Sequence, residues 1–473
     1  MRTSSSQAEP CRDGYLAHIL RELGLLTVFQ SSSDVKLLIA QRFVRLFAYG
    51  GSTLILASYL SALGISDDRI GLFMTLTLVG DVVISFFLTL FADKMGRKAV
   101  LVLGSGLMAA SGVVFGLFGD FWVLLLAAVF GVISPSGNEI GPFRAVEEST
   151  LAHLTPDEVL PDIFAWYSLL GTGGTALGIM TCGWAIHLLR ELKGWEFTAT
   201  CRMVYFLYAA LGGLKVLFTL GLSGEVEAVA RQAPGGEQQG VDETQPLLAE
   251  QSLSSVQAQH GNPPKKSWFR VSLDRDLVPL ITKLFVLFAV DSFASGLASM
   301  SWMTYFFRNK FSLPEGNLAS IFFTTSIICS ISMLVASSIS KRIGNVKTMV
   351  FTHFPSTIFL SLIPLPTTLL PSLTFLILRA STQSMDVAPR SAFLATALPA
   401  DKRTAIMGAV NVVKTASQSV APFITGVLGA RGHLGVAFCV AGGLKGVYDL
   451  GMLVCFAGRD GKRTRVDGEE GQA

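Results

Sequence analysis

LTLFADKMGRKAVLVLG, residues 88–104, is the stretch that decides the architecture of this chain. An acid, Asp93, and a basic turn separate two long apolar segments, approximately residues 70–91 and 99–118. A helix of about 20 apolar residues crosses a hydrocarbon core of roughly 30 Å and satisfies its own backbone polar groups there. The stretch therefore predicts two membrane-spanning helices joined by a short charged turn at the membrane surface.

The apolar character continues along the 473 residues of the chain. Hydrophobic residues make up 51% of the sequence, charged residues only 15%, and the mean hydropathy is +0.53, which excludes a water-soluble surface. A net charge of +3 gives no reason to expect a nucleic-acid partner. The six cysteines are scattered without paired spacing, so neither a metal nor a cofactor is expected.

Apolar spans recur along the whole sequence. In the first half they run approximately over 39–63, 70–91, 99–118, 121–143, 163–189 and 201–223. They resume at approximately 279–306, 317–339, 348–367, 371–394, 405–428 and 434–457. We therefore predict an all-α polytopic membrane protein with about twelve transmembrane helices in two halves of six.

The hydrophilic segments set the predicted domain boundaries. Residues 1–35 predict a cytosolic N-terminal tail, either unstructured or carrying an amphipathic surface helix. Residues 36–223 form the first six-helix half, and residues 224–276, rich in Gly, Gln, Ser and Pro, a disordered cytosolic linker. Residues 277–458 form the second half and 459–473 a cytosolic tail. Basic residues gather in loops on the side of both termini, which the positive-inside rule assigns to the cytosol.

The two halves also repeat one another in sequence. At a shift of 241 positions, RFVRLFAYGG starting at Arg42 aligns with KLFVLFAVDS starting at Lys283. At a shift of 247, GNEIGPF aligns with SMDVAPR, so that Glu139 falls opposite Asp386. Duplicated halves related by an axis along the membrane normal place a substrate site between them, near the bilayer midplane.

The charged turn resembles the signature loop between helices two and three of the major facilitator superfamily, written G-x-x-x-D-[RK]-x-G-[RK]-[RK]. The matching residues are Asp93, Lys94, Gly96, Arg97 and Lys98. Thr89 stands in place of the first glycine. The resemblance covers about residues 35–460 and implies a transporter that works by alternating access. It does not assign a subgroup or a substrate, because the Gly-Pro signature of drug antiporters and the sugar-porter signatures are missing.

These five matching residues are assigned to a cytosolic gate. An acid at a helix end and a basic turn beyond it can pair with neighbouring helix ends, and such contacts must separate when the halves rock. Charged residues at the cytosolic ends of spans four and ten are added to this gate as latch or charge-relay groups. They are Glu139, Arg144, Asp386 and Arg390.

Charged residues inside the spans are the candidates for transport, because a charge near the bilayer centre is costly unless it is paired or hydrated. Those assigned to a substrate or proton pathway are Arg45, Asp81, Asp291, Arg379 and Lys414. Asp81 or Asp291 is expected to take up and release a proton as access alternates, whereas Arg379 and Lys414 are suited to a carboxylate or phosphate of the substrate.

Some of the intramembrane charges have a simpler interpretation than a role in transport. Arg45 lies in the first two turns of span one and can reach the cytosolic interface by extending its side chain. Lys445 and Asp449 are four residues apart on span twelve, and we expect them to neutralise each other on one helix face.

One motif in the linker bears on localisation. Residues 243–248, ETQPLL, resemble the acidic dileucine signal that adaptor proteins read, with Glu243, Leu247 and Leu248 as its defining residues. A vacuolar or lysosomal membrane is therefore expected as an alternative to the plasma membrane.

Together these features predict a proton-coupled secondary transporter that moves a small organic solute and exports metabolites or xenobiotics. The expected partners are the solute, bilayer lipids and protons, and the chain is expected to act as a monomer. A transporter-like receptor that senses a solute without net flux is the alternative. An enzyme is not expected, because the histidines are dispersed along the chain, and no phosphate-binding loop motif indicates an ATP-driven pump.

Overall fold

The computed structural model describes residues 25–131, 133, 142–156, 158–231, 277–398 and 403–470. Over these ranges the chain forms helices joined by turns, with no strand. Seven of the helical stretches in the described part of the chain are long and apolar enough by composition to cross a membrane. The predicted all-α polytopic fold with two halves of six spans is confirmed.

The first half contains six spans preceded by one short helix. Its elements are α2 (Leu25–Gln30), α3 (Ser33–Ala62), α4 (Asp67–Met95), α5 (Arg97–Leu117), α6 (Phe121–Gly131), α7 (Pro142–Leu154), α8 (Leu160–Lys193), α9 (Phe197–Leu220) and the 3₁₀ segment η1 (Gly224–Arg231). Within the predicted span four the structure describes α6, and α7 begins after the undescribed residues 134–141 with Pro142, whose fixed φ suits the first position of a helix.

The second half repeats this plan. Its elements are α10 (Val278–Leu297), α11 (Met300–Phe311), α12 (Glu315–Ile343), α13 (Asn345–Leu362), α14 (Leu369–Ala380), α15 (Val387–Ala397), α16 (Arg403–Ala430) and α17 (Leu434–Glu470). Span seven is divided at Ala298 and Ser299, and span ten is divided between α14 and α15. Span ten, which the sequence repeat relates to span four, is therefore interrupted at residues 381–386.

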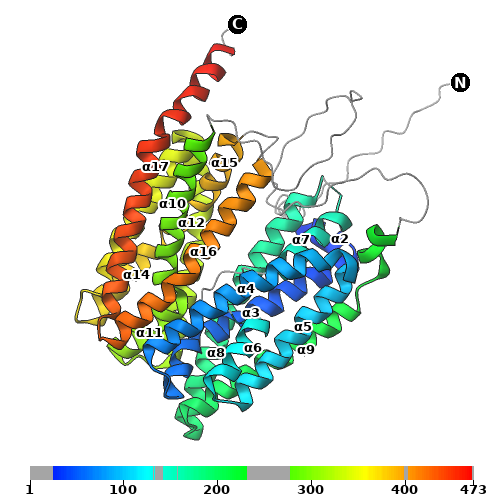
Figure 1. Ribbon diagram of the computed structural model, residues 1–473, viewed down its shortest axis with the longest axis vertical. Helices are drawn as coiled ribbons and strands as arrows, with labels where there is room; N and C mark the ends of the chain where they lie inside the picture. The colour runs from blue at the N-terminus through cyan, green and yellow to red at the C-terminus, as the bar shows by residue number, and fades with distance from the viewer. Residues whose placement is uncertain are drawn as a thin grey trace, which may run out of the picture.

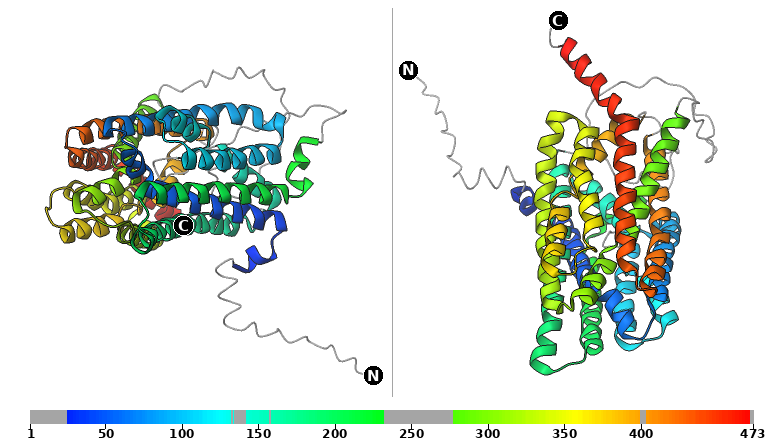
Figure 2. Two further views of the ribbon diagram at one scale, coloured as in Figure 1. Left: turned by 90° about the horizontal axis from the view of Figure 1, so that it is seen from below. Right: turned by 90° about the vertical axis from the view of Figure 1, so that its left-hand side faces the viewer.

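The two halves meet at one end and diverge at the other (Figure 1). The diverging end carries α2, η1, α15 and the C-terminal part of α17, and we call it the termini end; the opposite end is the far end. Views from two other directions show the long helices of both halves running side by side (Figure 2). The termini end is the side that the sequence assigns to the cytosol.

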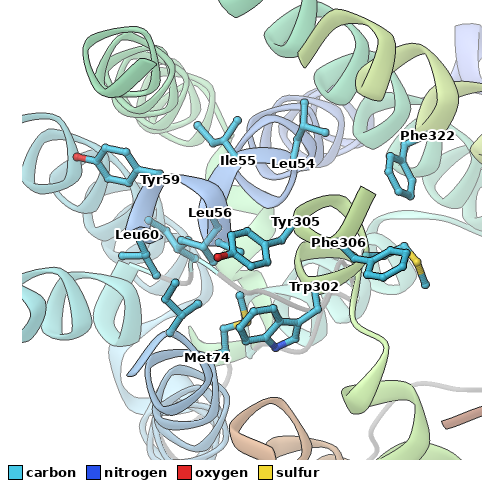
Figure 3. Close-up of a cluster of buried hydrophobic side chains, with 14 of the residues drawn as sticks. Leu54, Ile55, Leu56, Tyr59, Leu60, Met74, Trp302, Tyr305, Phe306 and Phe322 are labelled. Atoms are coloured by element: carbon cyan, nitrogen blue, oxygen red, sulfur yellow. The ribbon is translucent and has the colours of Figure 1, made fainter. Parts of the chain in front are cut away.

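The hydrophobic core follows the same division. A single cluster at the far end combines residues of both halves, with Leu56 of α3 beside Tyr305 of α11 (Figure 3). Toward the termini end the buried apolar residues form two separate clusters, one entirely within the first half and one entirely within the second. Apolar packing therefore joins the halves mainly at the far end.

Glycines allow the closest helix contacts. A Cβ on Gly178 of α8 would overlap the backbone carbonyl of Phe47 on α3, and one on Gly174 would meet that of Phe43, so this pair of small residues lets the two helices pack closely. Between the halves, a Cβ on Gly71 of α4 would overlap the backbone of α16 near Pro422. A larger side chain at Gly71 would push α4 and α16 apart.

Candidate functional site

Three side chains surround one buried acid in the first half. Arg45 on α3 donates to Glu147 on α7, with 3.0 Å from Nη1 to Oε1 and 2.8 Å from Nη2 to Oε2. Tyr167 on α8 donates from its hydroxyl at 2.8 Å, and Lys215 Nζ on α9 lies 3.2 Å from Oε1. We call Arg45, Glu147, Tyr167 and Lys215 the N cluster. The Glu147 side chain is fully buried, so these donors replace its hydration.

The sequence prediction missed the centre of this cluster. The predicted span four ends at residue 143, so Glu147 was not among the candidates, whereas the structure places it inside α7. Lys215 was overlooked, although a lysine deep in the apolar span six is itself a signal of a buried ion pair. Arg45 does not extend to the interface, since its guanidinium is held by Glu147.

A second cluster is centred on Asp291 in the second half. Asp291 on α10 accepts from Lys445 Nζ on α17 at 2.7 Å and from Arg390 Nη1 on α15 at 3.2 Å. Arg390 also forms an ion pair with Asp386, one turn earlier, and its guanidinium lies 5.7 Å from the ring centroid of Phe288. We call Asp291, Asp386, Arg390 and Lys445 the C cluster. Three charged groups predicted separately for pathway and gate are thus brought together in it.

A buried histidine and acid lie next to the C cluster. Nδ1 of His353 on α13 is 2.9 and 3.0 Å from the two carboxylate oxygens of Asp449 on α17. The expected pairing of Lys445 with Asp449 is therefore wrong. Lys445 reaches Asp291 instead, because a partner on another helix is available within the protein interior.

The other predicted pathway residues do not converge on one point. Asp81 on α4 is buried, and neither of its oxygens has a hydrogen-bond partner among the described residues. Arg379, in the last turn of α14, is half-buried and close to Cys329 of α12. Lys414 on α16 places its Nζ 5.7 Å from the centroid of the Phe288 ring, next to the C cluster.

The charged turn after α4 makes a contact of the kind expected for it. Lys98 donates to the carbonyl oxygens of Leu220 and Leu222 at 3.0 and 2.6 Å, at the C-terminal end of α9, where a cation is favoured. Gly96 has φ of +86°, which favours glycine, and Gly344 at the corresponding turn of the second half has φ of +88°. A gating role for this turn stays a prediction.

The remaining gate residues are described only in part. The helix α4 includes Asp93 and Lys94, whose side chains lie outside the description, and the Arg97 side chain is half-buried. Arg144 pairs with Glu148 at 2.6 Å, one turn later on α7. Glu139 and the sorting residues Glu243, Leu247 and Leu248 lie outside the described residues.

A polar latch that the sequence did not predict joins the halves at the far end. Glu315, at the start of α12, accepts from Arg190 of α8 at 2.8 Å and lies 3.1 Å from Arg308 of α11. Tyr305 of α11 donates to Asp67 of α4 at 2.7 Å. An open hollow of about 610 Å³ borders this latch. Nothing in the sequence indicated that these arginines share Glu315 as a partner.

Comparison with known proteins agrees with this architecture. The family model of the Major Facilitator Superfamily matches residues 38–422 and 284–472. The chain is 37% identical over 438 residues to the uncharacterized membrane protein YJR124C of Saccharomyces cerevisiae, covering 91% of this chain and 96% of the yeast protein.

Two solved structures share the fold at low sequence identity. The nucleoside transporter NupG superimposes with a TM-score of 0.64 at 16% identity, covering 90% of this chain and 99% of NupG. A D-xylose-proton symporter superimposes with a TM-score of 0.64 at 11% identity, covering 88% and 96% of the two chains. The chain is a multi-pass membrane protein that belongs to the Major Facilitator Superfamily.

Proposed function

We propose that this protein is a secondary active transporter that moves a small organic solute by alternating access, coupled to protons. The observation that carries the proposal is the division of the core: one apolar cluster shared by both halves at the far end, and separate clusters toward the termini end. Two rigid bodies joined at one end can rock about a site between them and expose it to one side at a time.

The far-end latch supports this mechanism. Arg190 and Glu315 belong to different halves, as do Tyr305 and Asp67, so these contacts must break for the far end to open. At the termini end, the partners of Lys98 and of Arg390 lie within the same half as the donor. In the proposed cycle, the charged turn of Asp93, Lys94, Gly96, Arg97 and Lys98 forms the latch that closes the termini end.

Two cations fit an anionic group on the substrate. Arg379 lies where span ten is interrupted, beside Cys329 and close in sequence to Gln383, whose amide donates to the Cys329 sulfur at 2.9 Å. Lys414 lies on the face of α16 next to the C cluster. Each of these groups, a guanidinium and an ammonium, is suited to bind a carboxylate or phosphate. Export of metabolites or xenobiotics remains part of this proposal.

Proton coupling needs a buried group that can be ionised in one state and protonated in the other. Asp81 is suited to this because its carboxylate is buried without a described hydrogen-bond partner, so a proton would remove an uncompensated charge. One of the two structural neighbours is named as a proton symporter, but at 11% identity the likeness extends to the fold alone. We propose the plasma membrane or a vacuolar or lysosomal membrane as the location.

The proposal is tested with purified full-length protein in sealed vesicles. A panel of organic acids, nucleosides, sugars and amphipathic drugs is screened for flux with and without an imposed pH gradient. We expect at least one solute whose flux rises with the gradient, and we expect Asp81→Asn to reduce that rise while the protein stays folded. Specific binding without flux under any gradient would favour the receptor alternative and overturn the transporter proposal.

A further inference from the structure

We propose that His353 and Asp449 form a further proton-binding site, and that this site releases its proton when Lys445 changes its partner. The inference rests on the proposed proton-coupled transport and assigns to it a site that is separate from Asp81. It is carried by the geometry of three side chains on α13 and α17 and by the charges that surround them.

The burial and the short distances of this pair favour one shared proton. His353 is 3% exposed and Asp449 is fully buried, and the imidazole Nδ1 lies within 3.0 Å of both carboxylate oxygens. With one shared proton the pair is neutral in total, whether it is drawn as imidazolium and carboxylate or as imidazole and carboxylic acid. Without that proton a carboxylate would be left in the protein interior opposite a neutral ring, which is costly.

The nearby acids already have cationic partners, so His353 and Asp449 are the pair suited to bind and release a proton. From α10, Asp291 faces two permanent cations, and Asp386 before α15 is paired with Arg390. Lys414 of α16 and the Tyr448 hydroxyl of α17 also lie within electrostatic range. The acids Asp291 and Asp386 are therefore balanced without a proton, whereas the described hydrogen-bond partner of Asp449 is a histidine.

Lys445 can exchange one acid for another. It now donates to Asp291 at 2.7 Å, but it lies four residues before Asp449 on α17, and side chains at this spacing share one face of a helix. If α10 moves away from α17, the ammonium group can reach Asp449. The Asp449 carboxylate would then be neutralised by lysine, so the proton held with His353 would be free to leave. Asp291, which would lose its lysine, would keep Arg390 and become hydrated as α10 moves away.

The interruption of span seven makes such a movement feasible. The helix α10 ends at Leu297, and α11 restarts at Met300 and packs into the far-end core with Trp302. The part of span seven that carries Asp291 is thus separated from the part that is fixed at the far end. Rearrangement of α10 during opening or closing would change the partner of Lys445 and couple conformation to proton occupancy.

The first test uses the proton itself as the probe, so it needs no knowledge of the solute. Infrared difference spectra of the purified full chain are recorded across a pH titration for the wild type, Asp449→Asn, His353→Asn, Asp81→Asn and the control His433→Gln. His433 is an exposed residue between α16 and α17. We expect a protonation signal that is lost in the Asp449 and His353 variants and kept in the other two.

Either of two results would overturn the inference: a titration signal unchanged in Asp449→Asn, or one abolished by Asp81→Asn alone. A variant that fails to fold is recognised by its thermal transition, and the conservative Asp449→Glu then serves as a second variant. It should retain a titrating signal at a shifted pH if the pair binds the proton, and its complete loss in a folded Asp449→Glu protein would contradict the site.

The second test uses the solute found in the vesicle screen. Asp449→Asn should exchange internal for external solute at a rate within about twofold of wild type, because exchange needs no net proton movement, yet lose accumulation driven by a pH gradient. Retained accumulation would contradict the inference. If the wild type itself shows no dependence on the gradient, the proposed proton coupling fails, while the infrared result still decides whether the pair binds a proton.

Discussion

The buried ion pairs of the two halves occupy equivalent spans with opposite signs. In the first half, span one supplies the cation Arg45 and span four the acid Glu147. In the second half, span seven supplies the acid Asp291 and span ten the cation Arg390. Coulomb attraction is unchanged when both charges are exchanged, so duplicated halves can keep a neutral pair at one place while the residues that form it differ.

The clusters differ more in what surrounds the pair. In the N cluster a single acid, Glu147, receives arginine, lysine and tyrosine donors. In the C cluster the acids Asp291 and Asp386 share their cations, and a histidine pair lies alongside. The N cluster therefore depends on a single acid, whereas a residue of the C cluster can lose or exchange one ion-pair partner and keep another.

Removing the central acid of the N cluster should have the largest effect. Glu147→Gln leaves Arg45 and Lys215 buried with no carboxylate in the cluster, and we expect a loss of roughly 3–5 kcal/mol in the free energy of unfolding. Thermal unfolding in detergent and the yield of folded protein measure it. Glu191→Gln, at an exposed acid of α8, is the matched control, and an equal loss in both variants would contradict the central role of Glu147.

Removing the central acid of the C cluster should cost less. Asp291→Asn leaves Arg390 its ion pair with Asp386, so one cation stays compensated, and we expect a loss of about 2 kcal/mol. The same thermal measurement compares it with Glu147→Gln. If the Asp291 variant were the less stable of the two, the proposed difference between the clusters would be reversed.

Exchanging the signs in the C cluster tests whether position matters more than residue identity. In the double variant Asp291→Arg with Arg390→Asp, the pair takes the orientation found in the first half, with the cation on the earlier span. We expect it to recover about 1–2 kcal/mol relative to the sum of the two single variants. A coupling free energy near zero would show that the two clusters are not interchangeable in sign.

The smallest effect is expected at the pair on the surface of α7. Arg144→Gln removes an ion pair with Glu148 one turn away, and the arginine side chain is 38% exposed. Solvent screens such a pair, so the loss should be about 0.5 kcal/mol or less. A loss comparable to that of Asp291→Asn would mean that Arg144 has a further structural role at the termini end.

The sequence determined the membrane fold because crossing a bilayer is a local property of about 20 apolar residues. Residues 88–104 illustrate this: α4 ends at Met95, α5 begins at Arg97, and the intervening Gly96 supplies the positive φ of the turn. The twelve spans could be predicted for the same reason, and the division into two halves could be predicted because the sequence repeats itself.

Only the tertiary structure decided which charges meet. Lys445 and Asp449 are neighbours on one helix, but their partners Asp291 and His353 lie 154 and 96 residues away in sequence. An ion pair on one helix turn contributes only about 0.2–0.5 kcal/mol, so it yields to a buried partner brought close by packing. Glu147 escaped prediction because it follows the apolar stretch 121–143 that was assigned to span four. Its partners Arg45, Tyr167 and Lys215 come from three other helices, and such contacts cannot be derived from spacing along the sequence.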